Sequence, residues 1–165
     1  MGQVQFRTAN RSDASALVAL KRAAIEAIDT AQYTESQLTA WQPDESAVTD
    51  FERAIDSETF DVVVASNTDE IVAYGVLRPE ASRIEAIFVH PDHTGCGIGR
   101  SLVRQLESRA RMSGLSEIKI VASLNAKSFY ESLSYWDFGR ECRRIDGVEL
   151  EFAIMRKVFD FDTKR

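Results

Sequence analysis

Cysteine is scarce in this chain of 165 residues, and no long apolar run occurs in it. Two cysteines, Cys96 and Cys142, are too few for a disulfide framework or a zinc site, and we expect no disulfide between them. No segment approaches the roughly 20 apolar residues that a membrane span needs, and the N-terminus lacks the apolar core of a signal peptide. These absences predict a soluble, cytoplasmic protein without a membrane partner.

Positive charge is also in short supply. Lysine and arginine together number 20, against 26 aspartates and glutamates, which gives a formal net charge of -6. A protein that binds duplex nucleic acid needs a basic surface, so this balance argues against nucleic acid as a partner. Apolar residues at 44% and charged residues at 28% are ordinary for a globular protein, and the length fits one domain, residues 1–165. Lysine occurs only at Lys21, Lys119, Lys127, Lys157 and Lys164.

Hydrophobic periodicity predicts that strands and helices follow one another along the chain. Strands are predicted at 4–9, 61–66, 71–77, 83–90 and 117–122, with a last hairpin at 142–155 that turns at Asp146-Gly147. Helices are predicted from Ser12 onward, after a capping box at Thr34 and Gln37, and at 46–56, 98–112 and 125–133. The predicted fold class is therefore α/β, with antiparallel hairpins at both flanks and one strand–helix–strand crossover at about 83–122.

The stretch VHPDHTGCGIGRSLV (89–103) places three glycines at alternate positions between a strand and a helix. Free backbone N–H groups and the positive end of the helix dipole meet at such a junction, and glycines let an anion approach the main chain. Two phosphate-binding loops do not fit: after Gly99 a Walker A loop needs lysine, and a dinucleotide loop would need glycine at Arg100. A glycine-rich turn that merely packs the helix on the sheet stays open as an alternative.

A second motif lies downstream, in ASLNAKSFYESLSY (122–135). Together the two motifs resemble the GNAT superfamily of acetyl-CoA-dependent N-acetyltransferases. The first is similar to that family's strand and pyrophosphate loop, usually [Q/R]-x-x-G-x-[G/A], and the second to its N-x-x-A-x-x-F-Y-x-x-x-G-F region. The resemblance covers roughly residues 60–158, and RTANRSDASALVALKR (7–22) resembles the usual opening strand and helix. Two residues depart from the pattern: Thr94 replaces Gln or Arg, and Ser134 replaces a glycine before the aromatic residue.

The resemblance implies a mixed central sheet with helices on both faces, in which the strands at 83–90 and 117–122 splay apart to form a cleft for acetyl-CoA. The backbone of the first strand would pair with the pantetheine arm like an added strand, and the loop amides would hold the pyrophosphate. Asn125 would reach the cofactor near the pantetheine or phosphate. The residues thus implied in cofactor binding are Ile87, Phe88, Val89, Thr94, Gly95, Cys96, Gly97, Ile98, Gly99, Arg100 and Asn125.

The resemblance also implies a reaction in which a deprotonated amine attacks a thioester carbonyl and a thiolate leaves. Tyr130 occupies the family's usual general-acid position and would donate a proton to that thiolate. The alternative is that Tyr130 packs beside Phe129 in the core. Glu85 has apolar neighbours along its strand and is our candidate for a general base that acts through water. The alternative for Glu85 is a solvent-facing residue at the rim of the strand.

The acceptor pocket is expected to come from the early helices, where Tyr33 and Trp41 would either line it or cap the core. His90 and His93 are expected to stabilise their loop, and no carboxylate–histidine cluster supports a metal site. The net negative charge mildly favours a cationic acceptor, although the local field matters more than the total. We therefore expect an N-acetyltransferase that acts on a primary amine of a small molecule or peptide, as a monomer or homodimer. A non-catalytic acyl-CoA-binding or interaction module is the alternative.

Overall fold

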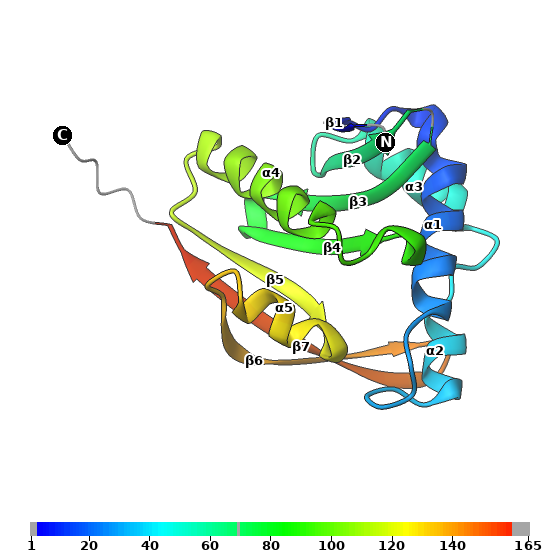
Figure 1. Ribbon diagram of the computed structural model, residues 1–165. Coiled ribbons are helices and arrows are strands. Elements are labelled where there is room, and N and C mark those ends of the chain that lie inside the picture. The colour runs from blue at the N-terminus through cyan, green and yellow to red at the C-terminus, as the bar shows by residue number, and fades with distance from the viewer. Residues whose placement is uncertain (1–2, 69, 160–165) are drawn as a thin grey trace.

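The computed structural model describes residues 3–68 and 70–159, and a single seven-stranded sheet lies at its centre (Figure 1). The strand order is β1-β2-β3-β4-β5-β7-β6, and among the described strands only the pair β4 and β5 is parallel. The strands are β1 (Val4–Thr8), β2 (Asp61–Asn67), β3 (Glu70–Arg78), β4 (Arg83–Val89), β5 (Glu117–Ser123), β6 (Trp136–Ile145) and β7 (Val148–Val158). The helices are α1 (Ala14–Glu26), α2 (Glu35–Trp41), α3 (Ala47–Asp56), α4 (Ile98–Met112) and α5 (Lys127–Glu131). Asp69, part of the predicted turn between β2 and β3, lies outside the described residues.

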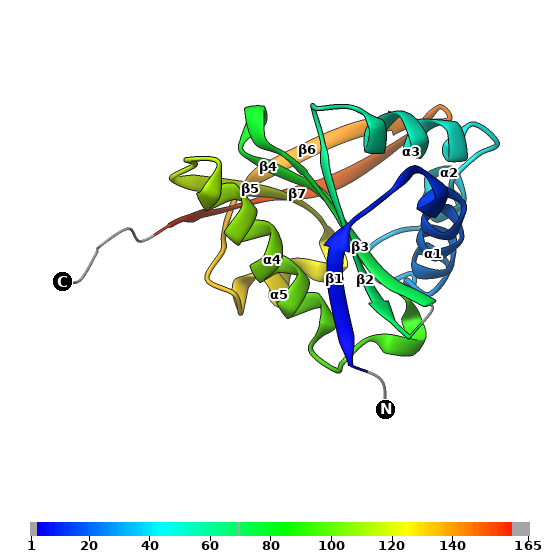
Figure 2. The ribbon, with the colours of Figure 1, turned by 90° about the horizontal axis from the view of Figure 1, so that it is seen from above.

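Helices cover both faces of the sheet, as Figure 2 shows: α4 and α5 lie on one side, and α1, α2 and α3 on the other. On β2, Val63 and Ala65 belong to the core beneath α4, whereas Val62 and Val64 pack with residues of α1. Successive side chains of a strand point to opposite faces, so a strand covered on both faces needs a continuous apolar run. The VVVA run of β2 meets this requirement, and the predicted α/β arrangement is confirmed.

Local signals in the sequence fix several element ends. The Thr34 hydroxyl accepts the amide of Gln37 at 3.1 Å, and the Gln37 side chain accepts the amide of Thr34 at 2.9 Å, so the predicted capping box starts α2. Asp146 and Gly147 have φ values of 52° and 75°, as the predicted type I′ turn requires. The first helix is shorter than predicted, because a 3-10 turn precedes its start at Ala14.

The end of the chain departs more from its pattern. β6 begins at Trp136, not at Cys142, because a register shift between Asp137 and Gly139 interrupts the alternation there. Ser134, just before β6, has a φ of 76°. Glycine adopts this left-handed conformation without strain, whereas a residue with a Cβ atom is strained in it. This explains why the related motif carries glycine at that position.

β4 carries the feature that opens the sheet. It pairs with β5 only at Arg83 and Ile84, and its later residues pair with β3 alone. The register with β3 passes from Ile84 to Ala86, which makes Glu85 the extra residue of a β-bulge. A bulge bends its strand and re-aims a side chain. The predicted splay of β4 from β5 is thereby confirmed, and it begins at Glu85.

Candidate functional site

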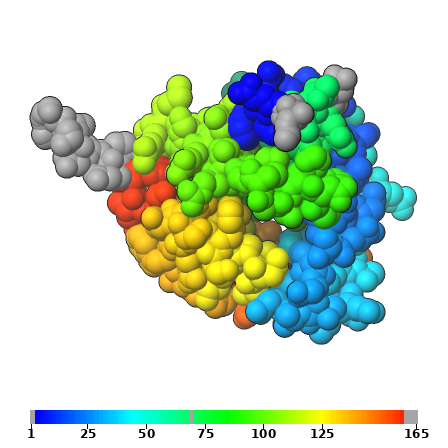
Figure 3. Space-filling view, in the orientation of Figure 1, coloured from blue at the N-terminus to red at the C-terminus, as the bar shows by residue number. Residues whose placement is uncertain are grey.

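The splay opens a cleft of about 920 Å³ between the two halves of the sheet. Figure 3 shows a hollow where the green segment after β4, the yellow segment around α5 and the blue end of α1 meet. The volume lies within the roughly 300–1,000 Å³ of typical small-molecule sites. The residues of the predicted cofactor site that line it are Ile87, Phe88, Val89, Thr94, Gly95, Gly97, Gly99, Arg100 and Asn125. Cys96 and Ile98 do not line the cleft, so only their backbone amides remain candidates for contact with the cofactor.

The N-terminus of α4 forms one end of this cleft. Gly97 is the N-cap with a φ of 88°, and no side chain caps the helix. The first amides of an α-helix have no acceptor inside it, which leaves those of Ile98, Gly99 and Arg100 for another partner. A Cβ added to Gly97 would meet no atom within 4 Å, so the space before the loop is open. Free amides, the helix dipole and open space together suit an anion such as a phosphate.

Gly99, the third glycine of the loop, is required for a different reason. A Cβ on Gly99 would lie 3.2 Å from Cζ of Phe129, so this position lets α5 pack tightly against the start of α4. The loop also bonds to itself: the Thr94 hydroxyl donates to the Pro91 carbonyl at 3.1 Å, and the Cys96 thiol donates to the His93 carbonyl at 2.9 Å. The alternate glycines therefore combine an open cradle with close helix packing.

Tyr130 of α5 lies where the cleft meets a second, smaller pocket, and it lines both. The side chain is buried, with the rings of Phe129 and Tyr135 at centroid distances of 5.0 and 6.0 Å. Among the described residues its hydroxyl has no hydrogen-bond partner. Burial raises the pKa of Tyr130, so the phenol keeps its proton at neutral pH. The Tyr130 ring packs in the core, and its hydroxyl can still donate a hydrogen bond to a molecule in the cleft.

The smaller pocket, the inner pocket, has a volume of about 190 Å³ and aromatic walls. The ring of Trp41 lies 5.8 Å from that of Phe88 and 5.2 Å from that of Phe152, measured between centroids. Trp41 lines this pocket from the end of α2.

Glu85 also lines the inner pocket, but in polar surroundings. Its carboxylate lies 3.0 Å from Arg83 and 4.0 Å from Nη2 of Arg143, and Glu141 contacts both of these arginines. The expected apolar neighbours are present only in part: Ala86 and Ile87 line the inner pocket beside Glu85, whereas Ile84 is buried in the core. The fold adds the arginines, and Arg143 comes from β6.

Of the two roles predicted for Tyr33, lining an acceptor pocket or capping the core, the structure places it in the core. It is 2% exposed and lines neither the cleft nor the inner pocket. Its hydroxyl donates to the Glu151 carbonyl at 2.6 Å and accepts the Leu124 amide at 3.0 Å. Tyr33 therefore ties β7 to the turn that leads from β5 to Asn125 and Tyr130, and its role is to position that turn.

The sequence analysis did not identify two charged residues that line the inner pocket, Lys21 and Arg143. Lys21 follows Leu17 by four residues and precedes Ala24 by three, so it lies on the apolar stripe of α1. Its ammonium is 5.8 Å from the ring centroid of Phe88. Burial lowers the pKa of Lys21, and the charge of Arg143 lowers it further. A lysine within an apolar stripe could have identified Lys21 from the sequence, whereas no sequence pattern pointed to Arg143.

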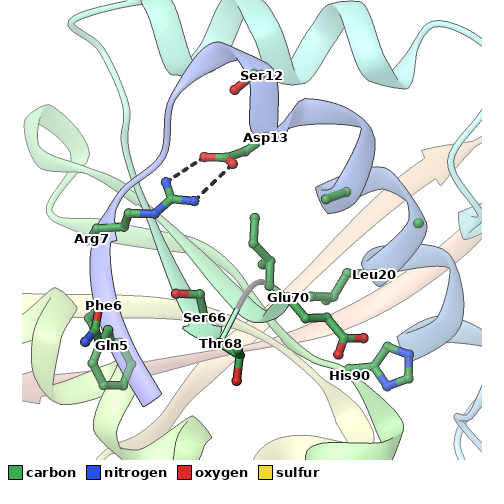
Figure 4. Close-up of a pocket in the computed structure, with 13 residues that line it drawn as sticks. Gln5, Phe6, Arg7, Ser12, Asp13, Leu20, Ser66, Thr68, Glu70 and His90 are labelled. Carbon is green, nitrogen blue, oxygen red and sulfur yellow. Dashed lines mark hydrogen bonds and ion pairs between the residues drawn. The ribbon is translucent and has the colours of Figure 1, made fainter. Parts of the chain in front are cut away.

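Another cavity, of about 760 Å³, lies between β1, the start of α1 and the β2–β3 hairpin (Figure 4). Arg7 points at Asp13 there and donates to both carboxylate oxygens, at 2.8 and 3.1 Å. Asp13 also accepts the Asn10 amide at 2.8 Å. His90, at the rim, accepts the Asp92 amide of its own loop at 3.1 Å, in line with its predicted role. The charged pair Arg7 and Asp13 is thus already bonded within the protein.

Other kinds of site were sought in the described residues. No group of three or more His, Cys, Asp or Glu side chains among them is placed to hold a metal ion. No helix in the same ranges is both long and apolar enough to cross a membrane. Cys96 and Cys142 are exposed free thiols.

Comparison with known proteins bears on this geometry. Residues 29–158 match the family model described as an acetyltransferase (GNAT) domain. The chain superposes on a crystal structure of an N-acetyltransferase from Rhodopseudomonas palustris with a TM-score of 0.84 and 28% identity, covering 96% of this chain and 98% of the other. The PaiA N-acetyltransferase of Thermoplasma acidophilum, solved with coenzyme A, has the same fold at 17% identity, with a TM-score of 0.76 over 95% of this chain and 99% of its own.

A curated relative, an uncharacterized acetyltransferase of Streptococcus pyogenes serotype M1, is 32% identical over 95 residues. The match spans 56% of this chain and 66% of that relative, so the chain covers just under two thirds of its length.

Proposed function

The chain belongs to the GNAT acetyltransferase family, and from this premise we propose that it transfers an acetyl group from acetyl-CoA to a primary amine of a small molecule or peptide. The amine would attack the thioester directly while both substrates are bound. The observation that carries the proposal is the cleft, which joins an open helix N-terminus at one end to an unbonded tyrosine hydroxyl at the other.

The residues present fit coenzyme A. The space before Gly97 that a side chain would fill, and the uncapped amides behind it, suit the pyrophosphate. Beyond Ile84 the edge of β4 is not paired with β5, so Ile87 to Val89 can accept the pantetheine arm as an added strand. Acetyl-CoA supplies the activated acyl group as a thioester.

The chain's own residues would then act on protons. Tyr130 would donate a hydrogen bond, and then its proton, to the sulfur as charge develops there. Glu85 would accept a proton from the incoming amine, directly or through a water, with Arg83 and Arg143 holding the carboxylate in place. Trp41 and Phe152 would exclude water from the inner pocket.

The test follows thiol release from acetyl-CoA with a thiol-reactive dye, in the presence of a panel of amines. We expect release that depends on the amine, together with an acetylated product by mass spectrometry. Calorimetry with coenzyme A provides the parallel binding measurement. Coenzyme A binding without thiol release for every amine would favour the non-catalytic alternative.

A further inference from the structure

One charged group of the inner pocket lacks a counter-charge. Lys21 lines the pocket, and among the described residues no carboxylate lies within 4.0 Å of its ammonium. Asp44 acts on it only from farther away, and that carboxylate is exposed and already accepts the amide and hydroxyl of Ser46. Lys21 is half-buried, and a charge partly removed from water is costly unless a partner, here a ligand, supplies the opposite charge.

The remaining charges around the pocket cancel. Arg83 and Arg143 face Glu85 and Glu141 in a cluster of two positive and two negative groups. Lys21 therefore leaves this pocket positive, although the chain as a whole carries -6. The local field is opposite in sign to the net charge that suggested a cationic acceptor.

We infer that the acceptor is an amino acid, whose carboxylate lies against Lys21 and Arg143 while its amine lies toward Glu85 and Tyr130. The inference rests on the proposed function and names its substrate class. A molecule with both groups on one carbon satisfies the unpaired cation and the carboxylate of Glu85 at the same time. A simple amine or a polyamine would leave Lys21 unpaired.

The walls of the pocket support this assignment. Lys21 comes from α1 and Arg143 from β6, so the two cations reach the pocket from different elements. The guanidinium of Arg143 lies 5.4 Å from the ring centroid of Phe152, and the aromatic rings leave an apolar space for a side chain. The volume of about 190 Å³ is below that of typical drug-sized sites, which favours a small acceptor. A bound carboxylate would also offset the burial that lowers the pKa of Lys21.

The test compares L-leucine, L-methionine and L-phenylalanine, each as the free acid, the primary amide and the decarboxylated amine. We expect kcat/KM for thiol release to be about 10- to 100-fold higher for the acids, as for a hydrogen bond to a charged group. Lys21→Met should remove this preference mainly by raising KM for the acids, and Lys21→Arg should keep it. The ratio of parent to variant for each acceptor cancels differences in the acceptors' own amine pKa values.

Lys119→Met is the matched control, because the Lys119 ammonium also lies over a ring, 5.5 Å from the centroid of Phe138, but lines neither the cleft nor the inner pocket. It should change no preference. Amines that react without any advantage for the acids would overturn the inference and leave the proposed function standing. Equal slowing of all three acceptor forms by Lys21→Met would make Lys21 a base and also overturn it. If coenzyme A binds and neither these acceptors nor the wider panel of amines reacts, the proposed function fails, and the inference with it.

Discussion

The cleft between β4 and β5 and the cavity beside β1 have similar volumes, about 920 and 760 Å³, but the buried polar side chain of each, Tyr130 and Asp13, is in a different state. In the cavity, Arg7 and Asp13 bond to each other (Figure 4). In the cleft and the inner pocket beside it, the amides that start α4, the hydroxyl of Tyr130 and the ammonium of Lys21 are without such partners. Donors left unbonded in a concave site are available to a ligand, so the state of these groups, and not size, is our reason for placing the proposed active site in the cleft and for regarding the other cavity as structural.

The strongest test of this comparison fills the open cradle. Gly97→Val should abolish measurable binding of coenzyme A by calorimetry, because the side chain enters the space before the amides and cannot adopt a φ of 88° without strain. Gly114→Val is the matched control, since Gly114 has a φ of 87° and equally open space at the other end of α4. It should cost stability but keep the affinity. Unchanged affinity in a folded Gly97→Val protein would refute the pyrophosphate assignment.

The next test removes the unbonded hydroxyl. Tyr130→Phe should preserve the fold and coenzyme A affinity while lowering kcat by ~10²–10⁴-fold, the usual worth of a general acid. Tyr135→Phe serves as the control, because that hydroxyl is bonded to Glu107 at 2.6 Å. It should lower stability and leave kcat near that of the parent. A parent-like rate for Tyr130→Phe would remove Tyr130 from the chemistry.

Glu85→Gln should have a smaller effect, about 10²-fold at most, because Arg83 already binds this carboxylate. The defect should be largest at low pH, where the acceptor amine is mostly protonated, and shrink as the pH approaches the amine's own pKa. Glu141→Gln, which contacts the same arginines without lining the pocket, is the control in the pH–rate profile. A defect independent of pH would make Glu85 a positioning residue for the arginines.

In the structural cavity, Asp13→Asn should change stability and not kinetics. We expect the free energy of unfolding in urea at pH 7 to fall by about 1–2 kcal/mol, since the bond to the half-exposed Arg7 is partly screened. The bonds from Arg7 lower the pKa of Asp13, so its contribution is complete above the unfolded pKa of about 3.9 and is lost as the pH falls through the lowered value. The gap between parent and variant should thus narrow below about pH 4. A changed kcat/KM would instead give this cavity a functional role.

The proposed cofactor half of the site could be predicted from the sequence because that half is local. One strand, one glycine loop and the start of one helix supply most of its residues within 87–100, and there the resemblance to the GNAT motifs identifies them. Capping and turn signals are local too, which is why the starts of α2 and β7 were predictable.

The proposed acceptor half was predicted only in part, through Trp41 and Glu85 but not Lys21 and Arg143, because it is assembled from distant segments. Lys21, Trp41, Glu85 and Arg143 come together only through the sheet order β4-β5-β7-β6 and the packing of α1 and α2 on one face. Tyr33 shows the same limit, since only the fold determines whether an aromatic residue faces a pocket or bonds across the core.

The splay of β4 from β5 also bears on self-association. Separating two strands in the middle of a sheet creates two edges with free backbone groups, and exposed edges of this kind recruit strands from other molecules into aggregates. Here both edges face one cleft, overhung by the loop before α4 and bordered by α5 and the end of α1 (Figure 3). We therefore expect these walls to let the edge accept a narrow extended ligand more readily than a strand from another copy of the chain.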